Sequence, residues 1–107
     1  MFERHGFVFH PHATPSRGGS TQIALWTVEV PANAESERHQ VDKEEVFHVL
    51  DGRVTIHDVE AGRGDTVVVP PHTDFRLVGG PATVLVATSV GVTGSVGGQR
   101  IDPPWAR

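Results

Sequence analysis

Short runs rich in β-branched and aromatic residues follow one another along this chain, and each is ended by Gly, Pro, Asn or Asp before it reaches helical length. The runs span residues 7–9, 22–30, 46–50, 53–59, 66–70, 75–78 and 83–90. Runs of this length and spacing are typical of an antiparallel sandwich or barrel. No stretch combines a 3.6-residue apolar periodicity with helix caps. The sequence therefore predicts an all-β fold, and 107 residues suit a single domain over 1–107 with one core.

Turn-forming residues predict how the runs are connected. Asp51-Gly52 lies between two apolar runs and tolerates positive φ, which predicts a tight hairpin there. His57 and Asp58 are then expected on the exposed edge of the following strand. Residues 10–21, rich in Pro, Gly and Ser, are predicted to form a surface loop or arm. In the C-terminal tail, 91–107, we expect Trp105 to dock on its own barrel or on a neighbour.

Composition excludes several classes of function. The chain has nine Lys and Arg residues against thirteen Asp and Glu, and its arginines are scattered along the sequence. Nucleic acid is therefore not an expected partner. Cysteine is absent, so any metal would have to bind His, Asp or Glu. The N-terminus carries charges where a secretory signal needs an apolar run, and no segment has the apolar length of a membrane span. We expect a cytoplasmic protein without membrane contact.

The segment "HQVDKEEVFHVLDG", residues 39–52, carries the first of two spaced motifs. It resembles the first motif of the cupins, which reads Gly, five residues, His-x-His, three or four residues, Glu, six residues, Gly. His39, Glu45 and Gly52 stand at matching positions, with Asn33 at the first Gly and Val41 at the second His. The chain is therefore similar to the cupins in this region.

The second cupin motif, Gly, five residues, Pro-x-Gly, two residues, His, three residues, Asn, resembles residues 64–79 in spacing. Gly64 and Pro70 match, whereas His72, Phe75 and Gly79 replace the internal Gly, the His and the Asn. The resemblance implies a small single-domain cupin of the conserved-barrel type with degenerate metal-binding motifs. It also implies an antiparallel β-barrel of the jelly-roll kind.

In metal-binding cupins the ligands are the two histidines and the glutamate of the first motif and the histidine of the second. Only His39 and Glu45 match here, because Val41 and Phe75 cannot coordinate a metal. Two alternatives stay open. In one, His39, Glu45 and His72 hold a divalent metal such as Fe, Mn, Ni or Zn. In the other, which we favour, no cofactor is bound and His39 and Glu45 act as a coupled pair, His39 as base or acid and Glu45 as its orienting partner.

Strand parity predicts which side chains surround this pair. Glu45, Phe47 and Val49 share the inward parity of their strand, which places Glu44 and His48 on the outer face. The expected substrate-binding residues also include the apolar side chains that the motifs bring to the same cavity and one histidine at the barrel mouth. The full set is Trp26, Val41, Phe47, Val49, His72 and Phe75. Trp26 belongs to it only if its side of strand 22–30 faces inward.

Three functions follow from this arrangement. The first is a small-molecule-binding cupin that transfers protons without a metal, as an isomerase, cyclase or lyase. The second is a metal-dependent oxygenase or isomerase that uses His39, Glu45 and His72. The third is a non-catalytic ligand-binding or sensing module. The resemblance, together with sheet edges that need covering, also implies a homodimer.

Overall fold

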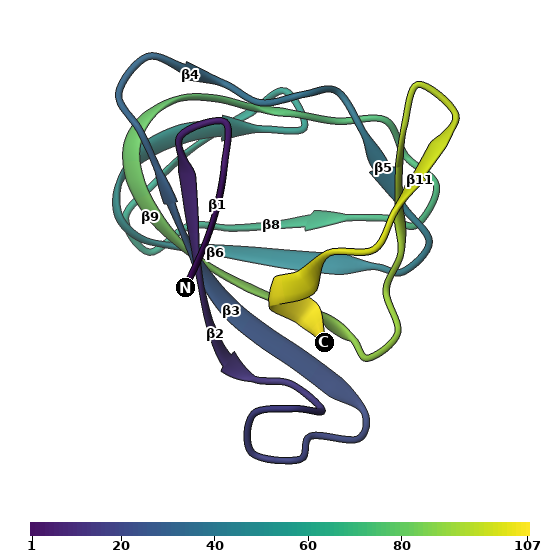
Figure 1. Ribbon diagram of the computed structural model, residues 1–107. Coiled ribbons are helices and arrows are strands. Elements are labelled where there is room, and N and C mark those ends of the chain that lie inside the picture. Colours follow the sequence, from purple (N-terminus) through teal and green to yellow (C-terminus); the bar gives the residue numbers. More distant parts are fainter.

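The computed structural model describes residues 1–107 as two antiparallel sheets that curve into a barrel (Figure 1). The strands are β1 (Phe2–Arg4), β2 (Phe7–Ala13), β3 (Ile23–Val30), β4 (Ala34–Glu35), β5 (Gln40–Val41), β6 (Glu45–Ile56), β7 (Val59–Gly62), β8 (Thr66–Val69), β9 (Leu77–Ser89), β10 (Gly94–Val96) and β11 (Gln99–Ile101). The larger sheet has the order β1-β2-β3-β9-β6-β7, with β4 beside β9 and β8 beside β6. The smaller sheet has the order β11-β10-β5. The predicted all-β fold is confirmed.

The only helix is the 3-10 turn η1 (Pro104–Ala106), so no helix has the length and apolar character needed to cross a membrane.

The long strands β6 and β9 each join two runs that the sequence predicts as separate strands. The predicted hairpin at Asp51-Gly52 is wrong, because β6 passes straight through it with irregular register on both sides. The hairpin that joins β6 to β7 lies at His57-Asp58, whose φ values are 51° and 62°. These two residues are therefore turn residues and not part of a strand. A bulge and a tight turn both use residues that accept positive φ, so Asp-Gly does not distinguish them.

Alternating side chains of β3, β6, β8 and β9 build the core. Trp26 pairs with Val86, Val86 with Phe47, and Phe47 with Val67, and all four are buried. This row shows that the Trp26 side of β3 faces inward, which the sequence left open. It also confirms that Phe47 lies on the inner face of β6.

Both predicted irregular segments contain regular structure. Residues 10–13 extend β2, so the loop begins only at Thr14. The tail forms β10, β11 and η1, and Trp105 stacks on Phe9 with the ring centroids 3.7 Å apart. The backbone N–H of Ser16 donates a hydrogen bond of 3.2 Å to the carbonyl of Arg107, which ties the chain end to this loop. Of the two predicted docking sites for Trp105, its own barrel or a neighbour, the structure shows its own barrel.

Candidate functional site

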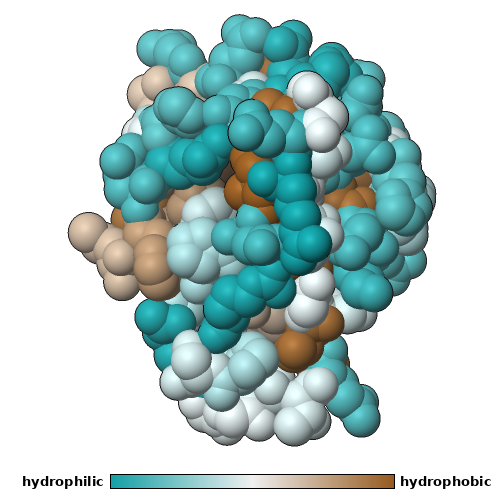
Figure 2. All heavy atoms as spheres, turned by 45° about the vertical axis from the view of Figure 1, so that its right-hand side comes forward, coloured by the Kyte–Doolittle hydropathy of each residue, from teal (hydrophilic) through white to brown (hydrophobic).

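An apolar cavity of about 140 Å³ occupies the barrel interior, between the β3, β6 and β9 wall and the smaller sheet. Most of its lining is hydrophobic, including both tryptophans and four of the five phenylalanines. Apolar cavities of about 150 Å³ in proteins admit a benzene ring. Figure 2 looks onto the side that carries β5 and β11, where hydrophilic residues cover most of the surface and hydrophobic residues show in small groups between them. The cavity therefore suits a small apolar molecule.

Glu45 is the polar side chain most deeply buried in this cavity. It is the first residue of β6, pairs with Val69, and is 5% exposed. Burial is the one cause that acts on its pKa and raises it from 4.5 to about 8, because no hydrogen bond or charge of the protein stabilises the ionised form. At neutral pH Glu45 is therefore mainly a neutral carboxylic acid that can donate a hydrogen bond into the cavity.

His39 also lines the cavity, and the backbone fixes its position. Its N–H donates to the carbonyl of Phe75 at 3.0 Å, the N–H of Phe75 donates back at 2.9 Å, and the two rings lie 4.5 Å apart. Nδ1 lies 2.8 Å from the main-chain carbonyl of Glu37, which can only accept, so Nδ1 carries the proton. Burial lowers the pKa of His39, although the Glu37 carbonyl opposes that shift. The neutral ring therefore has its lone pair on Nε2, which can act as a base.

His39 and Glu45 share the cavity but are not hydrogen-bonded to each other. No hydrogen bond or ion pair joins them, since the ring is held by Glu37 and the carboxyl group has no protein partner. The hydrogen bond by which Glu45 was predicted to orient His39 is therefore not formed. The physical reason is that the main chain before β5 already supplies an acceptor for Nδ1. The cavity therefore contains a buried imidazole and a buried carboxyl group that no hydrogen bond joins.

The other predicted binding residues divide into two groups. Trp26, Val41, Phe47 and Phe75 all line the cavity. Val49 is fully buried in the core beyond the lining. His72 is exposed in the turn before Phe75, with φ of 59°, and its N–H donates to the carbonyl of Val41 at 2.8 Å. Its side chain is therefore not part of the cavity wall.

These positions do not fit the alternative metal site of His39, Glu45 and His72. The structure brings no three His, Asp or Glu side chains together in a group that could hold an ion. Within the cavity, the donors from the motifs are His39 and Glu45 alone, and His72 lies outside. Two protein ligands fall short of the three or four that first-row metals commonly bind.

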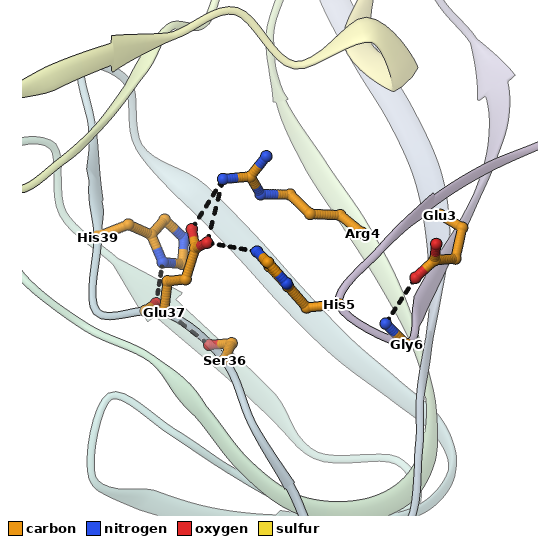
Figure 3. A network of polar contacts seen from close by, with 7 residues as sticks. All are labelled: Glu3, Arg4, His5, Gly6, Ser36, Glu37 and His39. Atoms are coloured by element: carbon orange, nitrogen blue, oxygen red, sulfur yellow. Dashed lines mark hydrogen bonds and ion pairs between the residues drawn. The ribbon is translucent and has the colours of Figure 1, made fainter.

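A charged network at the cavity rim was missed by sequence reasoning. Arg4 Nη2 donates to both carboxylate oxygens of Glu37 at 3.1 and 3.0 Å, and His5 Nε2 lies 2.6 Å from Oε1 (Figure 3). The hydrogen bond from Arg4 is the largest effect on the pKa of Glu37 and lowers it. Arg4 and His5 precede both motifs and meet Glu37 only because the β1–β2 turn folds over the cavity, so no local signal identifies them.

A family model for the cupin domain matches residues 25–88, which is more than half of the chain, and the chain belongs to the cupin family. No curated protein matches it in sequence.

Solved structures share the fold at low identity. One is salicylate 1,2-dioxygenase from Pseudoaminobacter salicylatoxidans with gentisate, at a TM-score of 0.70 and 19% identity; the match covers 90% of this chain and 30% of that one. Another is the polyketide cyclase RemF from Streptomyces resistomycificus, at 0.68 and 20% identity, covering 90% of this chain and 68% of that one. The chain thus spans less than a third of the dioxygenase.

Proposed function

We propose that this cupin binds a small apolar or aromatic molecule in its barrel and catalyses proton transfer on it, as an isomerase, cyclase or lyase does. The observation that carries the proposal is the complementary protonation of two buried groups in one cavity. Near neutral pH, His39 is unprotonated at Nε2 and Glu45 retains its proton, because burial lowers the pKa of the imidazole and raises that of the carboxyl. Opposed shifts of this kind are typical of paired acid and base catalysts.

The chemistry follows from these two groups. His39 Nε2 removes a proton from an acidic C–H or O–H of the substrate, and the resulting imidazolium keeps its Nδ1–H on the Glu37 carbonyl. Glu45 donates a hydrogen bond to the oxygen on which negative charge develops, in an apolar surrounding that strengthens this interaction. The proton on His39 then passes to another atom of the substrate. No electrons are exchanged, and no step calls for a metal.

The structural neighbours do not distinguish this chemistry from others, because a dioxygenase and a polyketide cyclase share the same barrel fold. The proposal rests on the cavity of this chain.

His39→Ala is expected to abolish proton transfer, while the matched variant His48→Ala retains it. His48 lies on the outer face of β6, where its side chain is hydrogen-bonded to that of Thr66. The measurement is deuterium incorporation in D2O into phenylacetone, phenylacetaldehyde and 2-indanone, followed by proton NMR after dialysis of the protein against EDTA. Loss of a general base lowers such rates by about 10² to 10⁴. Equal exchange by wild type and His39→Ala would refute the role of His39, and stabilisation by these compounds without exchange would indicate a binding module.

We also propose that the chain forms a homodimer through the outer face of β3, β9, β6 and β8. Two cross-strand rows make up this face. They are Leu25, Ala87, Val46 and Val68, and Thr27, Leu85, His48 and Thr66. Neither row contains Asp, Glu, Lys or Arg, so two copies can pack without opposing charges. Val68 is 50% exposed although it is apolar.

The wild-type dimer is expected to have twice the chain mass of 11.5 kDa. Val68→Glu is expected to lower the mass in solution to that of one chain, whereas Val59→Glu is expected to leave the dimer mass unchanged. Val59 is similarly exposed, at 48%, but begins β7 outside the two rows. A buried unpaired carboxylate at a dimer interface costs several kcal/mol. Light scattering measures the mass, and a wild-type chain that runs as a monomer would contradict the proposal.

A further inference from the structure

We propose that Arg4 is the specificity-determining residue of the cavity and selects ligands that carry a carboxylate. The ligand class is then an aromatic or alicyclic acid, with the carboxylate at the rim and the apolar body inside. This inference rests on the proposed function of the cavity as a small-molecule site. It adds the chemical class of the ligand, which neither the family nor the paired acid and base specifies.

Arg4 is the only Lys or Arg among the residues that line the cavity. It lies at the end of β1, and its side chain is 41% exposed, so it is half-buried at the rim. Only Nη2 is used within the protein, where it meets both oxygens of Glu37. Figure 3 shows this one nitrogen facing the carboxylate, while the other two guanidinium nitrogens make no drawn contact. Arg4 therefore keeps donors at Nη1 and Nε for a ligand.

The guanidinium is suited to a second carboxylate. Its donors lie in one rigid plane, so Nη2 can hold Glu37 while the N–H groups of Nη1 and Nε, which lie on different edges of that plane, remain for a ligand carboxylate. Glu37 already fixes Arg4 over the cavity, which reduces the side-chain entropy that ligand binding would otherwise cost. Glu37 also interacts with His5, so its negative charge is shared between two partners and opposes an incoming anion less.

The interior accepts an apolar body but offers no second anion site. Phe9 and Trp105 stack against each other along the lining, and Trp26 and Phe47 belong to the same wall. Glu45 would repel an anion whenever it ionises, and as a neutral acid it prefers a carbonyl or hydroxyl oxygen. A carboxylate is therefore placed at Arg4, and a neutral oxygen is placed at Glu45.

Three probes that share one benzene ring but differ in charge test which charge the site prefers. They are benzoate, an anion, benzamide, which is neutral, and benzylamine, a cation. Binding to the full chain is followed by NMR through the indole N–H signals of Trp26 and Trp105. Benzoate is expected to bind wild type at least about tenfold more tightly than benzamide, as charge-assisted bonds to a guanidinium imply. Arg4→Gln removes this preference and leaves benzamide binding within about twofold. Arg4→Lys, which keeps the charge without the planar guanidinium, falls between them.

Arg53→Gln serves as the matched control, because Arg53 is exposed, pairs with Glu60 and does not line the cavity. It is expected to bind all three probes as wild type does. Equal binding of benzoate and benzamide, or an equal loss of both in Arg4→Gln, would overturn the role of Arg4 while small-molecule binding stands. Preference for benzylamine would overturn it as well, since it would assign the charge recognition to Glu45. Failure of all three probes to perturb Trp26 or Trp105 would overturn this inference and the proposed function together.

Discussion

Gly52→Ala is expected to lower the free energy of unfolding by about 3 kcal/mol or more, the range typical of substitutions that force backbone to move in a packed core. Gly52 has φ of +78°, and an added Cβ would lie 2.1 Å from the carbonyl oxygen of Pro81 and 2.8 Å from the Cα of Ala82. Both atoms belong to the backbone of β9, so the clash cannot be relieved by a rotamer change. The change must separate β6 from β9 or distort the bulge.

Gly64→Ala isolates the cost of positive φ alone. Gly64 has φ of +89°, and an added Cβ there meets nothing within 4 Å. Gly64→Ala is expected to lower the free energy of unfolding by about 1 kcal/mol, the cost of a left-handed conformation for an L-residue. Urea unfolding followed by circular dichroism measures both variants. Equal losses would mean that β6 and β9 are not in close backbone contact at Gly52, contrary to the structure.

Glu45→Gln is expected to remove a pH-dependent loss of stability. The pKa of Glu45 is about 8 in the folded state and 4.5 as the ordinary value. Because the folded pKa is the higher one, folding takes up a proton between these values. The contribution of protonated Glu45 to the free energy of unfolding is complete below about pH 4.5 and is lost as pH rises to about 8. The free energy of unfolding of wild type should therefore fall by a few kcal/mol relative to Glu45→Gln over this range.

Glu44→Gln is the matched control, since Glu44 is the exposed neighbour on the outer side of the chain. Its unfolding free energy should follow that of wild type at every pH. Denaturant titrations at several pH values supply the curves, and subtracting the Glu45→Gln curve cancels the other carboxylates. Parallel curves for wild type and Glu45→Gln would show that Glu45 ionises normally, and the proposed acid would be lost with it.

Most of the barrel could be predicted because its signals are local. Alternation along residues 45–49 placed Glu45, Phe47 and Val49 inside, and all three are buried. The motif spacing brought His39 and Phe75 to one place, where they form a backbone bridge. These features depend on neighbours within a few residues or on a pattern that the family repeats.

The errors arose where one local signal serves two structures. Positive-φ residues mark both a turn and a bulge, so the sequence predicts at Asp51-Gly52 the hairpin that lies at His57-Asp58. His72 was expected at the barrel mouth because of its place in the motif, but its side chain is exposed in a turn. The pairing of β6 with β9 distinguishes the bulge from the turn, and a hydrogen bond to Val41 holds the backbone of His72. Both partners are distant in sequence.

The sequence by itself determined the fold class, the family and the inward parity of β6, because strand periodicity and motif spacing are written in short stretches of chain. Tertiary structure alone decided the chemistry of the cavity. Burial without a partner raises the pKa of Glu45, and the Glu37 carbonyl fixes the tautomer of His39. Arg4 reaches the rim through a contact spanning 33 residues. Such effects depend on desolvation and long-range contacts, which exist only after the chain has folded.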